Sequence, residues 1–94
     1  MIVRRWTYVV KPGCAKELID LLHEAFDEYD RNLRIYTSHT GPNSVVAFEM
    51  EYEGLSDYQQ SATEWWAVPE NTARYKRYVE LVESGGMTEF WNLH

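Results

Sequence analysis

The sequence predicts an α+β fold in which one four-stranded antiparallel sheet carries helices on one face. Segments rich in β-branched and aromatic residues alternate with segments that repeat apolar residues every three or four positions. The order of these segments along the chain is strand, helix, strand, strand, helix, strand. With 94 residues the chain is long enough for one such domain and too short for two. We therefore expect residues 1–94 to form a single domain.

Residues 2–10 are predicted to form the first strand, because β-branched and aromatic types dominate them. The strand ends at Lys11-Pro12-Gly13, where proline removes a backbone donor and glycine permits a positive φ angle. From residue 14 to 31 apolar residues recur at helical spacing, and charged residues occupy the opposite face. This pattern predicts a helix that packs on one side only.

Residues 32–40 and 45–53 are predicted to form two strands of a hairpin, joined by the four-residue loop 41–44. The even positions of the second strand are apolar between 46 and 52, which predicts that one of its faces is buried. A four-residue loop would place His39 opposite Val46, on the side of the sheet that the helices cover.

A helical segment at 56–83 is predicted to break at Pro69, because the residue before a proline avoids the α region. Residues 87–93 follow as a short final strand. The complete order is β-α-β-β-α-β, which is the ferredoxin-like arrangement with both helices on one face of the sheet.

Charge and composition exclude several classes of function. Fifteen acidic and nine basic residues give a net charge of −6, so we expect neither nucleic acid nor an anionic membrane surface as a partner. The chain has no apolar leader and no membrane-spanning run, which predicts a cytoplasmic protein. A single cysteine, Cys14, excludes a disulfide framework. No phosphate-binding loop or metal-binding motif occurs, so we expect no cofactor and no metal.

The sheet face opposite the helices is expected to need a cover. Large exposed apolar patches are rare on monomers, and a second copy related by a two-fold axis would cover this face, so we expect a homodimer. The alternative is a solvated face, which its charged residues would allow. The residues predicted on this face are Val3, Arg5, Thr7, Val9, Tyr36, Val45, Ala47, Glu49 and Glu51.

Three stretches of the chain resemble a known family. Arg-Arg-Trp-Thr-Tyr-Val-Val-Lys-Pro-Gly at 4–13, Gly-Pro-Asn-Ser-Val-Val at 41–46 and Leu-Ser-Asp-Tyr at 55–58 are similar to NIPSNAP-type members of the dimeric α+β barrel superfamily. The resemblance implies a ferredoxin-like monomer whose sheet packs against that of its partner. The superfamily includes cofactor-free antibiotic-biosynthesis monooxygenases and haem-degrading monooxygenases. Trp6 and Tyr75 stand where the haem-degrading pattern has asparagine and histidine, so the resemblance argues against haem.

The strongest candidate site is aromatic. Trp6, Tyr8, Phe48 and Trp65 can converge between the sheet and the helices, where they would form a cleft that binds a small apolar or aromatic molecule. The alternative is a closed core in which the same rings contribute packing alone.

His39 and Tyr75 are the candidate catalytic residues, because either side chain could transfer a proton. Histidine has an ordinary pKa near 6.5, although a structural role for His39 remains the alternative. If the protein is an enzyme, we expect a cofactor-independent monooxygenase that acts on an activated aromatic substrate. A ligand-binding module and a structural partner protein are the other two possibilities, and the size of any cavity distinguishes the third from the first two.

Overall fold

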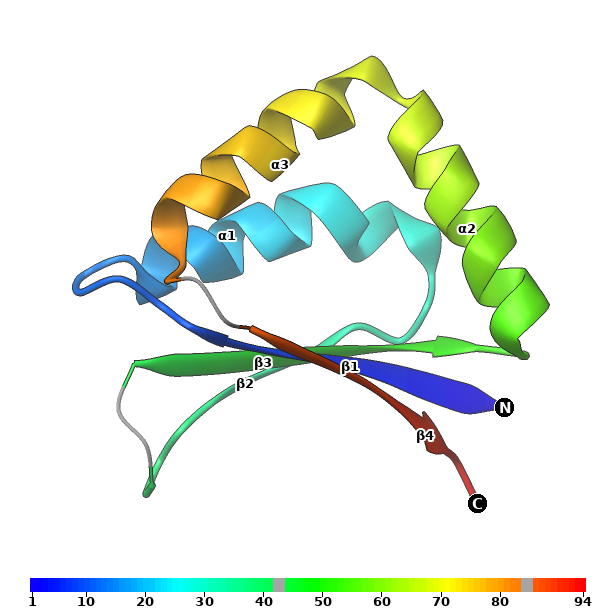
Figure 1. Ribbon diagram of the computed structural model, residues 1–94, viewed down its shortest axis with the longest axis horizontal. Coiled ribbons are helices and arrows are strands. Elements are labelled where there is room, and N and C mark those ends of the chain that lie inside the picture. Colours follow the sequence, from blue (N-terminus) through cyan, green and yellow to red (C-terminus); the bar gives the residue numbers. More distant parts are fainter. Residues whose placement is uncertain (42–43, 84–85) are drawn as a thin grey trace.

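The computed structural model describes residues 1–41, 44–83 and 86–94, so Pro42 and Asn43 of the predicted hairpin loop lie outside the described residues. The described residues form one sheet in the order β2-β3-β1-β4, with every neighbouring pair antiparallel. The helices cover one face of this sheet and leave the other bare, which confirms the predicted fold class (Figure 1). The elements are β1 (Ile2–Val9), α1 (Ala15–Phe26), the 3₁₀ helix η1 (Asp27–Tyr29), β2 (Arg34–Thr37), β3 (Val45–Tyr52), α2 (Leu55–Ala67), α3 (Pro69–Leu81) and β4 (Met87–Asn92).

Strand β1 and helix α1 are both shorter than predicted. Val10 leaves the strand ladder and forms an isolated bridge with Val82. Gly13 has φ 78°, which glycine adopts at little cost, and the predicted turn there leads into α1. The chain turns away after η1 because Asp30 adopts a left-handed conformation with φ 47°, so α1 and η1 end before the predicted residue 31.

The predicted break at Pro69 is confirmed. Val68 is extended, with ψ 118°, and Pro69 occupies the first turn of α3, where its missing N–H group is not needed. Asn71 is 1% exposed and joins the two helices: its Nδ2 donates to the Trp65 carbonyl at 2.7 Å, and its Oδ1 accepts from Arg74 at 2.8 Å. The bond to Trp65 holds the corner at which α2 turns into α3, and the bond from Arg74, which lies within α3, fixes the Asn71 side chain.

The hairpin register differs from the predicted one by two residues. Thr37, not His39, lies opposite Val46, and β2 ends there instead of at residue 40. The connection between β2 and β3 is therefore longer than four residues. Gly41 and Ser44 within it both have positive φ angles. Because the shift is an even number of residues, each side chain of β2 keeps its predicted face.

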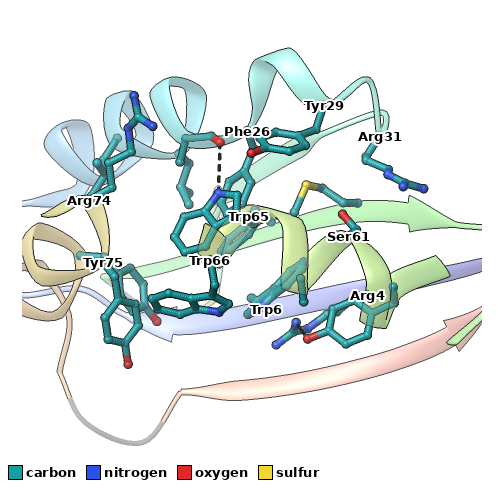
Figure 2. A pocket seen from close by; sticks show the side chains of 18 of the residues that line it. Arg4, Trp6, Phe26, Tyr29, Arg31, Ser61, Trp65, Trp66, Arg74 and Tyr75 are labelled. Carbon is teal, nitrogen blue, oxygen red and sulfur yellow. Dashed lines mark hydrogen bonds between the residues drawn. The ribbon is translucent and has the colours of Figure 1, made fainter. Parts of the chain in front are cut away.

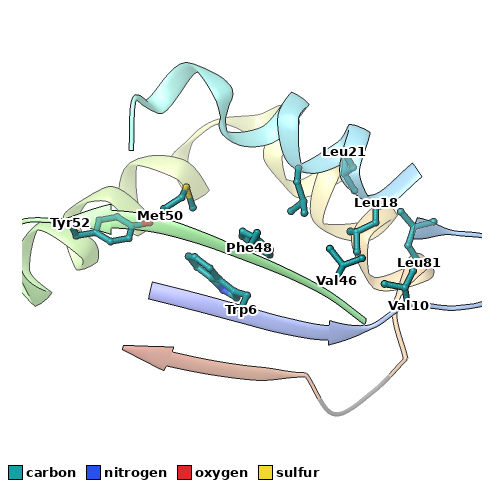
Figure 3. Close-up of a cluster of buried hydrophobic side chains, with 10 residues drawn as sticks. Trp6, Val10, Leu18, Leu21, Val46, Phe48, Met50, Tyr52 and Leu81 are labelled. Carbon is teal, nitrogen blue, oxygen red and sulfur yellow. The ribbon is translucent and has the colours of Figure 1, made fainter. Parts of the chain in front are cut away.

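The hydrophobic core lies between the sheet and the helices (Figure 3). Aliphatic side chains fill one end of it, and aromatic rings lie toward the other. In the parts of the chain that the structure describes, no helix is both long and apolar enough to cross a bilayer. The buried cluster is Trp6, Val10, Leu18, Leu21, Leu22, Val46, Phe48, Met50, Tyr52 and Leu81.

Candidate functional site

A cavity of about 360 Å³ lies between the sheet and the helices (Figure 2). Protein interiors rarely contain voids much larger than a water molecule, so the aromatic cluster is not a closed core. The volume falls at the lower end of the range of about 300 to 1,000 Å³ that is usual for small-molecule sites. The size of this cavity therefore admits a compact ligand.

Stacked aromatic rings form a wall of the cavity. The Trp6 and Phe48 rings are nearly parallel, with centroids 4.5 Å apart and an interplanar angle of 4°. Phe26 stacks on Phe48 at 5.9 Å and on Trp65 at 5.6 Å, which continues the series from the sheet to helix α2. Such a wall offers apolar, aromatic contact to a ligand, chiefly through ring edges, because the stacked faces contact one another.

Trp65 and Trp66 are adjacent in sequence but occupy different parts of the site. Trp65 Nε1 donates to the Ala25 carbonyl at 3.4 Å, which ties its ring to α1 (Figure 2). Trp66 is 51% exposed and meets the Trp65 and Tyr75 rings edge to face, at 4.9 and 5.2 Å. Neighbouring helical residues point about 100° apart, so one tryptophan faces the interior and the other lies at the rim.

Three tyrosines that line the cavity, one buried and two half-buried, carry hydroxyl groups with raised pKa values. Burial raises the pKa of Tyr78 far above its ordinary value, and a hydrogen bond with Tyr8 raises it further. Burial also raises the pKa of Tyr8, and it raises the pKa of Tyr52 to about 12. These phenols therefore stay protonated at neutral pH and act as hydrogen-bond donors rather than as bases.

The structure brings most of the sequence-predicted site residues to the cavity. Trp6, Tyr8, Phe48, Trp65 and Tyr75 all line it. Tyr75 comes from α3 and is 45% exposed, so it lies at the rim with Trp66.

His39 does not reach the cavity, and its predicted placement there is wrong. It is exposed in a bend after β2 and does not line the cleft. The register shift explains the error, because β2 ends before His39 can pair with the helix-covered part of β3. Among the described lining residues there is no histidine, aspartate or glutamate.

Arg4 and Tyr58 are two of the polar lining residues that the sequence interpretation missed. Arg4 lies two residues before Trp6 on β1, so strand alternation places both on the helix-covered face. Tyr58 comes from the first turns of α2, and its hydroxyl accepts a hydrogen bond from Arg4. The period of two along β1 was a signal that could have identified Arg4, whereas no local pattern marks Tyr58.

Comparisons with known proteins support the fold. No protein-family model and no curated protein matches the chain. An uncharacterized NIPSNAP domain protein from Burkholderia xenovorans has a TM-score of 0.84 at 21% identity, over 100% of this chain and 95% of that one. A NIPSNAP family protein from Agrobacterium tumefaciens has a TM-score of 0.85 at 19% identity, over 99% and 85%.

A second group of structures is similar at lower scores. An antibiotic biosynthesis monooxygenase has a TM-score of 0.72 at 11% identity, over 100% of this chain and 99% of that one. Identities this low establish the fold and leave the activity open. The chain thus has the ferredoxin-like α+β fold of the NIPSNAP domain proteins, as its sequence resemblance predicted.

Proposed function

We propose that this protein binds a small, flat, aromatic or apolar molecule in the cavity between the sheet and the helices. The observation that carries the proposal is a cavity of about 360 Å³ whose wall is a stacked series of rings. A purely structural protein would have no need of this volume, since filling it would add stability.

A substitution that fills the cavity tests this proposal. Ala62 of α2 lines the cavity, whereas Ala73 of α3 is exposed and does not line it. We expect Ala62→Phe to weaken binding of 2-naphthamide, a neutral planar probe, by about fivefold to a hundredfold, because overpacking the site costs roughly 1–3 kcal/mol. Ala73→Phe, the matched control, should bind like the unmodified protein. Quenching of tryptophan fluorescence measures the affinity, since Trp6 and Trp65 line the site. Equal affinity in all three proteins, or no saturable binding, would contradict the proposal.

Cofactor-independent monooxygenation is the catalytic form of the same proposal. It is supported by the fold shared with an antibiotic biosynthesis monooxygenase and by Tyr75 at the cavity rim. In this reaction an activated aromatic methylene group loses a proton, and its carbanion reacts with dioxygen. One oxygen atom becomes the ring carbonyl, and the other leaves as water with the two hydrogens of the methylene. Consumption of dioxygen with a bound substrate distinguishes this enzyme from the alternative, a binding module without chemistry.

The proposed assembly is a homodimer formed through the bare face of the sheet. Charges at the centre of this face are already paired within the chain: Arg5 with Glu49 at 2.6 Å and Arg34 with Glu51 at 2.6 Å. A second copy could therefore cover them without leaving unpaired charge. Exposed apolar side chains surround these pairs, namely Val9, Tyr36, Met87 and Trp91, which are 45%, 42%, 54% and 56% exposed.

The apolar surface on this face differs in part from the predicted one. Val3 and Ala47 were expected to need a partner, but they are only 6% and 4% exposed in the single chain. Met87 and Trp91 of the edge strand β4 provide exposed apolar surface instead, and the sequence interpretation did not include them.

Trp91→Glu is expected to convert the dimer into a monomer. Trp91 lies opposite Val3, on the bare face, so the substitution would place an unpaired charge in the contact. Trp66→Glu is the matched control, because Trp66 is 51% exposed but lies on the helical side. Light scattering at micromolar concentration gives the mass of each protein. A monomeric unmodified protein, or a dimer that Trp91→Glu leaves intact, would contradict the proposed interface.

A further inference from the structure

Arg4 is a partly buried cation without a carboxylate partner among the described residues. Its guanidinium carbon lies 3.9 Å from the centre of the Trp6 ring and 4.6 Å from that of Tyr58. One terminal nitrogen donates to the Tyr58 hydroxyl. Its Nε is buried and has no hydrogen-bond partner in the described parts of the chain. Unmatched buried donors are costly, so the chain itself leaves the Arg4 guanidinium incompletely compensated.

The other two arginines that line the cavity differ from Arg4, because each has a carboxylate partner. Arg31 donates to both oxygens of Asp57, at 2.5 and 2.9 Å. Arg74 donates to Glu24 at 3.0 Å. The described lining residues include no acidic group, so the positive charge of Arg4 is not neutralised inside the cavity.

The surroundings of Arg4 raise the cost of an uncompensated charge. Burial lowers the pKa of Arg4, although a guanidinium group keeps its proton at neutral pH. The rings of Trp6 and Tyr58 offset part of this cost through cation–π contact. The rings carry no net negative charge, whereas an anionic ligand group in the cavity would compensate the guanidinium fully.

We propose that the cavity selects a planar aromatic carboxylate and that Arg4 binds its carboxylate group. This inference rests on the proposed function, since it names the class of ligand for the same cleft. A planar ligand in the cavity would direct its carboxylate to Arg4, whose guanidinium lies over the Trp6 ring that also lines the cavity. Arginine and a carboxylate form strong, charge-assisted hydrogen bonds.

Because the net charge of the chain is negative, a preference for an anionic ligand would identify a local positive group in the cavity. At −6 the protein as a whole repels anions, so a preference for an anionic ligand cannot arise from the overall field. It must come from a local positive group. Arg5 provides a matched comparison, because it follows Arg4 on β1 but lies on the bare face of the sheet. There its side chain pairs with that of Glu49 at 2.6 Å.

Two probes of equal shape, 2-naphthoate and neutral 2-naphthamide, test the inference. We expect the unmodified protein to bind 2-naphthoate more tightly by about tenfold to a hundredfold, the range for one hydrogen bond to a charged group. Arg4→Gln should abolish this preference while 2-naphthamide binding persists, and Arg4→Lys should keep part of it. Arg5→Gln should retain the full preference.

The outcomes separate this inference from the proposed function. If the unmodified protein binds both probes equally well, Arg4 does not select an anion, yet the cleft still binds aromatic molecules. If it binds neither probe, the proposed function fails and the inference fails with it. If Arg4→Gln keeps the preference, another group binds the carboxylate and the assignment to Arg4 is wrong. If Arg4→Gln does not fold, Arg4→Lys tests the assignment, and the full preference for 2-naphthoate in that variant would contradict it.

Discussion

Replacement of Leu18 by alanine is expected to lower the free energy of unfolding by about 2–5 kcal/mol, the usual cost of truncating a buried leucine. Leu18 is 0% exposed and belongs to the same buried cluster as Val46 and Leu81 (Figure 3). None of these three residues lines the cavity between the sheet and the helices. The loss should therefore appear in stability, while the folded fraction still binds 2-naphthamide.

Leu55→Ala is the control for this experiment. Leu55 begins α2 and is 58% exposed, so its truncation should change the stability by no more than about 0.5 kcal/mol. Urea denaturation followed by circular dichroism measures both variants. Equal stability of the Leu18 and Leu55 variants would show that Leu18 is not part of the core.

Replacement of Asn71 by leucine is expected to cost about 1–3 kcal/mol of stability, because it removes the partners of buried polar groups. Asn71 of α3 donates to the Trp65 carbonyl of α2, which holds the corner between the two helices, and it accepts from Arg74 within α3. Trp65 and Tyr75 line the cavity from the two sides of this corner. We therefore expect weaker binding of 2-naphthamide as well as lower stability.

Two further variants show how Asn71 acts. Asn71→Asp keeps the acceptor for Arg74 but loses the donor to the Trp65 carbonyl, so it separates the two bonds. Asn92→Leu is the control, since Asn92 is exposed on β4 and should tolerate the change. Thermal unfolding and the fluorescence assay are the measurements. Unchanged stability and binding in Asn71→Leu would show that the corner does not depend on this side chain.

The order of helices and strands could be predicted from local pattern because each element has its own periodicity and end signals. The break at Pro69 follows from a restriction on the residue before proline, which no distant contact overrides. The ends of the hairpin strands were less predictable. The length of a connection depends on how both strands meet their other neighbours, and β3 is also paired along its whole length with β1.

The candidate site also combines features that local pattern predicts with features that depend on long-range contacts. Alternation along β1 and β3 placed Trp6, Tyr8 and Phe48 on the helix-covered face, and the structure finds them there. The predicted placement of His39 was wrong because it depended on the register of the hairpin, which is a long-range property. The face on which a strand residue lies depends only on whether its position is odd or even.

The sequence alone determined the class of fold and which residues face the helices, because both follow from local periodicity. Only the tertiary structure decided that the aromatic rings surround a cavity, since packing density depends on how the sheet and the helices meet. The tertiary structure also decided which arginine side chains pair with a carboxylate. Arg31 and Arg74 meet carboxylates 26 and 50 residues away along the chain, and Arg4 meets none among the described residues. Charge pairing over such separations leaves no local pattern in the sequence.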